Sequence, residues 1–80
     1  MNSLRVYINP ANGGALKGPQ VFYSRRADGP YYRWFYEEGL ARWCGARVRP
    51  SDSALKMLCM TSWKTVPVAL QIKLNEHYLE

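Results

Sequence analysis

This chain has few side chains that could hold a metal ion or carry out catalysis. Its 80 residues include only two cysteines, Cys44 and Cys59, and a single histidine, His77. These three are too few for a structural zinc site built from Cys and His in one chain, and two cysteines are too few for a disulfide-rich scaffold. We expect both thiols to be buried, because free cysteine is usually internal. The composition therefore predicts no metal site and no cofactor.

Catalytic chemistry also has little support in the sequence. His77 lies near the C-terminus, and neither cysteine has neighbours that would activate it as a nucleophile. The adjacent carboxylates Glu37 and Glu38 fall at an expected hairpin tip, where they point to opposite sides of the ribbon and cannot act as an acid/base pair. We expect no enzymatic activity and no small-molecule substrate.

Long apolar runs are absent as well. The N-terminal residues MNSLRVYINP lack the apolar core of a signal peptide, and nowhere do about 18 consecutive apolar residues occur. We therefore expect a cytoplasmic protein without a membrane partner. The hydrophobic fraction of 48% and the aromatic fraction of 14% are too high for a disordered chain, so residues 1–80 are expected to form a single small domain.

Arginine is missing from residues 51–80. The net charge of +5 lies within residues 1–50, and the remainder of the chain is neutral. Any electrostatic attraction for an anionic partner must therefore come from the first half of the chain.

That first half predicts an antiparallel meander. Residues 4–8 alternate apolar and polar side chains and are expected to form a short strand, followed by a loop rich in Gly, Asn and Pro. Asp28 and Gly29 predict a type I′ hairpin turn, because both central positions of that turn need positive φ. A second turn is expected around Glu38 and Gly39. The two turns define three strands within residues 20–49.

Alternation along these strands would sort the side chains onto two faces. One face has a dense aromatic band with Trp34 and Trp43 as its central cross-strand pair, and we expect it to form the core. The other face carries arginines in its middle and is expected to be exposed. The candidate binding residues on this exposed face are Arg26, Arg33, Arg42, Phe22, Tyr31 and Phe35.

Residues 50–80 are expected to cover the core face. Ser51 or Asp52 could cap a helix whose apolar positions include Leu55 and Leu58. Residues 65–80 alternate like a strand but also repeat apolar residues at i, i+4, and their strong helix formers favour a helix. The expected fold class is α+β, with a three- to four-stranded antiparallel meander over residues 1–49 and one or two C-terminal helices of residues 50–80 packed on one face.

The exposed face of arginine and aromatic residues is the main functional feature. Tyr and Arg are enriched in protein interfaces, so we expect a small non-catalytic binding module that recognises a protein partner or forms a homodimer. The same residue types suit single-stranded RNA or DNA, since arginine contacts phosphates and aromatic rings stack on bases. Nucleic acid is therefore the alternative partner. A third interpretation is an inert surface on which arginine only discourages aggregation.

Overall fold

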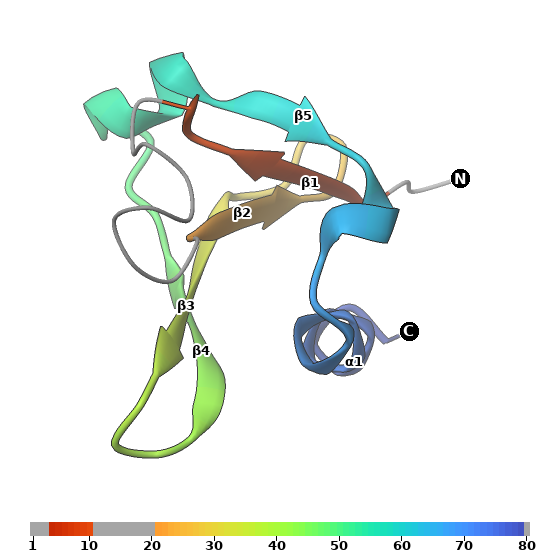
Figure 1. The fold of residues 1–80 in the computed structure, drawn as a ribbon. Helices are drawn as coiled ribbons and strands as arrows, with labels where there is room; N and C mark the ends of the chain where they lie inside the picture. Colours follow the sequence, from red (N-terminus) through yellow and green to blue (C-terminus); the bar gives the residue numbers. More distant parts are fainter. Residues whose placement is uncertain (1–3, 11–20, 80) are drawn as a thin grey trace.

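The computed structural model of this protein describes residues 4–10 and 21–79 (Figure 1). In these ranges five antiparallel strands form one sheet in the order β4-β3-β2-β1-β5. The fold is α+β as predicted, but the sheet has five strands rather than three or four. The elements are β1 (Arg5–Ile8), β2 (Phe22–Arg25), β3 (Tyr32–Glu37), β4 (Arg42–Arg47), the 3-10 helix η3 (Ser53–Met57), β5 (Cys59–Thr61), the 3-10 helix η4 (Trp63–Thr65) and α1 (Val68–His77).

The sheet is bent, and α1 packs on its concave side. The β3–β4 hairpin projects away from β1, β2 and β5, and α1 lies in the angle between the two parts (Figure 1). The prediction that a C-terminal helix covers one face of the meander is confirmed. In the described ranges, no helix has the length and apolar character needed to cross a bilayer.

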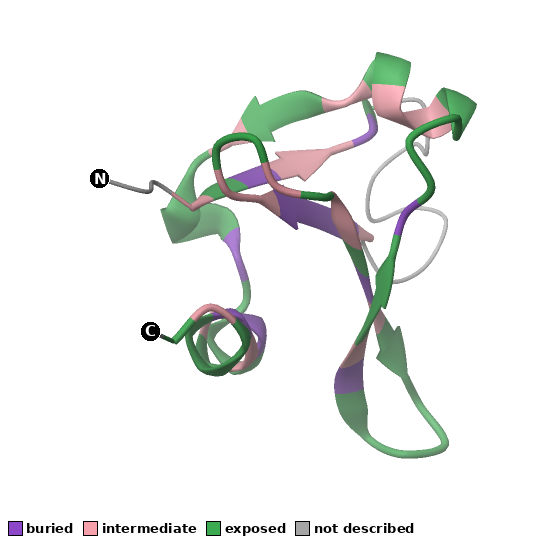
Figure 2. Ribbon diagram, turned by 180° about the vertical axis from the view of Figure 1, so that it is seen from behind, coloured by how far each residue is buried: buried purple, intermediate pink, exposed green. Residues whose placement is uncertain are grey.

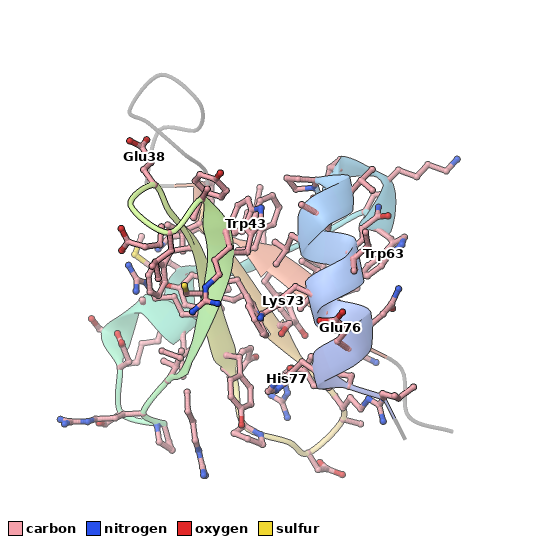
Figure 3. The ribbon with its side chains drawn as sticks, turned by 90° about the horizontal axis from the view of Figure 1, so that it is seen from below. Glu38, Trp43, Trp63, Lys73, Glu76 and His77 are labelled. Carbon is pink, nitrogen blue, oxygen red and sulfur yellow. The ribbon has the colours of Figure 1, made fainter. Side chains whose placement is uncertain are left out.

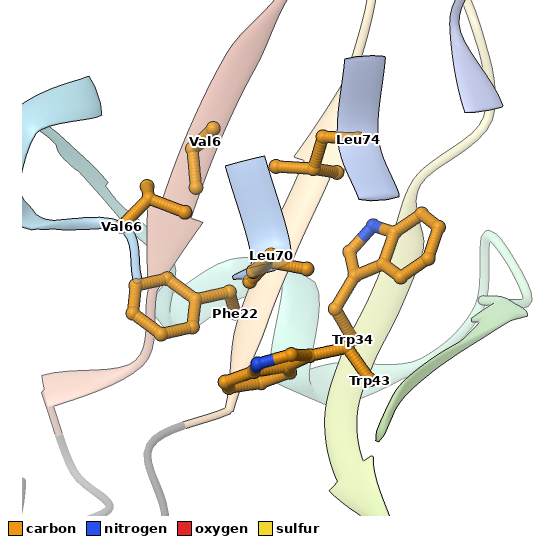
Figure 4. Packing of buried hydrophobic residues seen from close by; sticks show 7 residues of the cluster. All are labelled: Val6, Phe22, Trp34, Trp43, Val66, Leu70 and Leu74. Atoms are coloured by element: carbon orange, nitrogen blue, oxygen red, sulfur yellow. The ribbon is translucent and has the colours of Figure 1, made fainter. Parts of the chain in front are cut away.

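The hydrophobic core lies between the concave face and α1 (Figures 2 and 4). Leu70 and Leu74 of α1 are fully buried, and Trp34 and Trp43 are 2% and 9% exposed. The two indoles are therefore in the core, as predicted. The core cluster consists of Val6, Phe22, Trp34, Trp43, Val66, Leu70 and Leu74.

The turn between β2 and β3 differs from the predicted type I′ turn. The Gly29 N–H donates to the Arg26 carbonyl at 2.9 Å, and Asp28 has a φ of 62° while Gly29 is not left-handed. Phe22 consequently pairs with Trp34, one residue away from the predicted register. Since a one-residue slip moves every side chain of a strand to the other face, the predicted faces of β2 were wrong.

The hairpin of β3 and β4 keeps its predicted faces. Trp34 pairs with Gly45 and Tyr36 pairs with Trp43, which is a shift of two residues from the predicted register. A shift of two leaves each side chain on its own face. Trp34 and Trp43 therefore share the core face, although they are not directly opposite each other as predicted.

The predicted helix after Asp52 was also wrong. The Asp52 side chain does accept a hydrogen bond from the Ala54 N–H at 2.9 Å, as a helix cap would. Only the short η3 follows, and residues 59–61 then form β5, which pairs with β1. Pairing with a distant strand has overridden the helical spacing of the local sequence.

Candidate functional site

The outer face of the sheet, opposite α1, carries Arg33 and Phe35 side by side on β3. Arg33 is exposed and Phe35 is half-buried, and the Arg33 guanidinium lies 5.0 Å from the centre of the Phe35 ring. This distance is that of a cation–π contact. Glu37 follows on the same face, and Arg42, which is exposed, pairs with it across the hairpin. We call Arg33, Phe35 and Glu37 the β3 row.

Tyr31, another predicted binding residue, belongs to a second cluster on the outer face. The Arg25 guanidinium lies 4.7 Å from the centre of the Tyr31 ring, and the Tyr7 ring meets Tyr31 edge-on at 5.6 Å. Tyr31 raises the pKa of Arg25, so this guanidinium remains charged. Arg25 also pairs directly with Arg5 of β1, and like charges in that position repel. Sequence reasoning missed this concentration of charge because it placed Arg25 on the core face.

Two of the predicted binding residues do not lie on the exposed face. Phe22 is 4% exposed and packs edge-on against Trp43 in the core. Arg26 donates from Nη2 to the Tyr78 carbonyl, and its guanidinium lies 5.3 Å from the centre of the Tyr78 ring. Arg26 thus holds the C-terminal end of α1 against the β2–β3 turn. Both corrections follow from the register of β2.

A buried chain of hydrogen bonds joins the sheet to the same end of α1. The Trp34 Nε1–H donates to the Ser24 hydroxyl at 2.8 Å, and the Ser24 and Tyr78 hydroxyls are 2.8 Å apart. Ser24 is fully buried. Burial raises the pKa of Tyr78 above its ordinary value of 10.0, and the hydrogen bond to Ser24 opposes this effect only in part. Tyr78 is therefore neutral over the physiological range.

A groove runs between β4 and α1. It consists of two hollows of about 310 and 240 Å³ that share Arg42, Trp43 and Lys73 as lining residues. Lys73 points from α1 toward β4, and His77 lies one turn further along the helix (Figure 3). The remaining lining residues are Tyr32, Trp34, Tyr36, Ala41, Cys44 and Gly45 of the hairpin and Ala69, Ile72 and Glu76 of α1.

The groove does not bring a thiol to the histidine. The His77 ring packs edge-on against Tyr32 and Trp34, with centroid distances of 4.5 and 5.2 Å. Since Trp34 and its partner Gly45 face α1, alternation places the neighbouring Cys44 thiol on the outer face. The two groups therefore lie on opposite sides of β4. The absence of catalysis stays a prediction.

Cys44 is half-buried and Cys59 is exposed, so the expectation that both thiols are buried was wrong. In the described ranges, no three side chains of His, Cys, Asp or Glu are grouped so that they could hold a metal ion.

No protein-family model matches the chain, and neither the curated proteins nor the solved structures contain a significant match.

Proposed function

We propose that this chain is a non-catalytic protein-interaction module that pairs with a second copy of itself through the outer face. The observation that carries the proposal is the β3 row, in which a cation, an aromatic ring and an anion occupy alternate positions on one face of one strand. When two copies of this row run antiparallel, the cation of each faces the anion of the other and the two rings face each other. Interfaces with twofold symmetry need this kind of self-complementarity.

In the proposed dimer, two copies pack outer face to outer face about a twofold axis that passes between their Phe35 side chains. Their β3 strands then run antiparallel, and the two Phe35 rings meet at the centre. Because side chains on one face recur every second residue, Glu37 of each copy lies over the partner's Arg33. Two charge pairs would flank an aromatic contact, which is the arrangement of a hydrophobic interface centre with a polar rim.

The β3 row is also held in place before association. Arg33 is already stacked on Phe35, and it has no carboxylate partner within the described residues. The Gly39 N–H donates to Oε1 of Glu37 at 3.2 Å, which orients the carboxylate. Side chains that are ordered in advance lose less conformational entropy on binding, so more of the contact energy contributes to affinity.

The first test is the mass of the protein in solution. Light scattering across a concentration series is expected to show a monomer–dimer equilibrium for the wild type. Phe35→Glu should be monomeric and folded, because it places a charge at the centre of the interface. Val68→Glu makes the same change at an exposed apolar residue of α1 and should dimerise like the wild type. A wild type that stays monomeric at millimolar concentration would end the proposal.

A charge swap tests the register of the proposed dimer. Arg33→Glu and Glu37→Arg are each expected to raise the dimer Kd about tenfold, because each places like charges together across the interface. The double variant restores both opposite-charge pairs and should recover most of the affinity. Recovery would not occur if the outer faces met in another orientation, so an additive loss in the double variant would contradict this arrangement.

Single-stranded nucleic acid is the second candidate ligand of the outer face. It is favoured by the Arg5–Arg25 pair, which concentrates positive charge beside the rings of Tyr7 and Tyr31. Binding of a labelled random-sequence oligonucleotide, measured by fluorescence anisotropy, should weaken steeply with salt and in Arg25→Ala. Absent or salt-insensitive binding would remove this candidate.

A further inference from the structure

Among residues 4–10 and 21–79, β4 lies at one end of the sheet and pairs only with β3. The Val48 N–H donates to the Tyr31 carbonyl at 2.9 Å just beyond the paired residues. Hydrogen-bonded and non-hydrogen-bonded pairs alternate along an antiparallel ladder, so the even-numbered residues of β4 bond to β3. Trp43 and Gly45 therefore direct their backbone N–H and C=O groups away from the sheet.

The groove lies along this edge. One of its hollows is lined by the consecutive residues 42–45 of β4. The side chains of consecutive strand residues point to opposite faces. A hollow lined by all four residues therefore extends to the backbone at the outer edge of β4. The opposite wall is α1, from which Lys73 points toward β4 (Figure 3), and the largely buried indoles of Trp34 and Trp43 lie between the two walls.

The charge of the groove is mainly positive. Lys73 of α1 and Arg42, at the edge of β4, line both hollows, against the single carboxylate Glu76. Within the described residues, neither Arg42 nor Lys73 forms an ion pair. Acidic side chains are therefore the complement of this groove, and a second copy of the chain would bring the same basic residues together.

We propose that the groove between β4 and α1 docks an extended acidic segment of a partner protein, which adds to β4 as a further strand. Strand addition of this kind gives affinity through backbone hydrogen bonds and specificity through alternate side chains. The outward N–H and C=O groups of Trp43 and Gly45 recur at the two-residue spacing of an extended peptide, about 7 Å. Nucleic acid offers phosphate acceptors but no matching series of N–H donors, so the edge favours a peptide.

This groove is separate from the dimer surface. Side chains of the segment that face α1 would lie beside Trp43 and Lys73, whereas the β3 row is on the other side of the sheet. The two proposals therefore fail independently: Phe35→Glu should abolish dimerisation without weakening the peptide, and Lys73→Glu should weaken the peptide without changing the dimer.

The binding test uses a fluorescently labelled peptide of sequence Glu-Val-Glu-Val-Glu-Val as the probe. It should bind the full chain, and Lys73→Glu should weaken binding about tenfold, as expected for loss of one close charge pair. Lys56→Glu makes the same change on η3, outside the groove, and should bind like the wild type. The peptide Lys-Val-Lys-Val-Lys-Val should not bind.

A second pair of probes separates strand addition from charge attraction alone. Replacing the second of the three Val residues of the acidic peptide by Pro removes a backbone donor and should weaken binding, because proline interrupts a ladder of strand hydrogen bonds. Oligothymidylate carries negative charge but no peptide backbone, and it should not displace the peptide. Equal affinity of the proline peptide, or displacement by oligothymidylate, would overturn the proposal.

Amide hydrogen exchange measures the protection of the β4 backbone amides in the wild-type protein. This test therefore does not depend on the folding of any variant. The amides of Trp43 and Gly45 should exchange rapidly in the free protein and become protected at saturating acidic peptide. The Cys44 amide, which bonds to β3, should be protected in both states. Peptide binding without new protection at Trp43 and Gly45 would show that the segment does not add to β4.

Discussion

At the scale of single residues, Gly45 and Trp34 explain how the hairpin packs on α1. The two residues are paired across β3 and β4, and the Trp34 indole covers the space above Gly45. A Cβ at position 45 would lie 2.7 Å from Cε3 and Cη2 of the indole. Only glycine leaves room for the ring there, and the ring in turn reaches Ser24 with its N–H.

Gly45→Ala should destabilise the fold for this reason. Forcing an extra carbon into a packed site costs about 1–3 kcal/mol of the free energy of unfolding, measurable by urea denaturation. Gly39→Ala is the matched control, since its nearest neighbour would be the Glu37 carboxylate at an ordinary 3.4 Å. That change should be neutral or stabilising by about 0.4–1 kcal/mol. Equal effects of the two substitutions would contradict the packing described here.

Sequence reasoning found part of the candidate site at this scale. Arg33, Phe35 and Tyr31 lie on the face opposite α1, where alternation predicted them. Phe22 and Arg26 do not, because the position of Asp28 in its turn shifted β2 by one residue. The local sequence is compatible with either turn, and pairing of β2 with both of its neighbours decides between them.

At the scale of elements, α1 has one buried side and one exposed apolar side. Leu70 and Leu74 are fully buried, whereas Val68 and Ile72 are 69% and 55% exposed. The exposed apolar residues explain why residues 65–80 are ambiguous in sequence. Together with the buried residues they place an apolar side chain at every second position, which is also the pattern of a strand. The buried pair at i, i+4 and the hydrogen bonds of Tyr78 determine which side of α1 meets the sheet.

Alanine substitutions should separate the two sides of α1. Leu74→Ala removes buried methyl groups and leaves a cavity, so it should lower the free energy of unfolding by about 2–5 kcal/mol. Ile72→Ala, at an exposed position, should change it by no more than about 0.5 kcal/mol. Thermal or urea denaturation of both variants gives the comparison. A larger loss in Ile72→Ala would mean that α1 is rotated about its axis.

At the scale of the whole molecule, a few polar contacts at the C-terminal end of α1 complement the apolar core. Ser24 links Trp34 of the sheet to Tyr78, and Arg26 binds the Tyr78 carbonyl. These groups come from β2, the turn that follows it, β3 and the residue after α1, so they close the concave side at the end farthest from η4. Global unfolding must break them, which couples stability to the ionisation of Tyr78.

The pH dependence of stability should report this coupling. The folded state holds the pKa of Tyr78 above its ordinary value of 10.0, so the unfolded chain releases this proton first as the pH rises. The contribution is constant below the unfolded pKa, and stability falls as the pH rises from about 10 toward the folded pKa. Urea denaturation between pH 8 and 11, a window set by that pKa of about 10, should show a smaller fall in Tyr78→Phe. Identical profiles would exclude Tyr78 as the group responsible.

The amino-acid sequence by itself determined the antiparallel meander, the burial of both indoles of the β3–β4 hairpin, the exposure of Arg33 and Arg42, and the C-terminal helix. These features depend on alternation and helical spacing, which act over a few neighbouring residues. Only the tertiary structure decided the register of β2, the pairing of β5 with β1, and the position of Lys73 opposite β4. Each of these is a contact between distant segments, whose free energy depends on how the whole sheet bends around α1 and is not encoded in any local pattern.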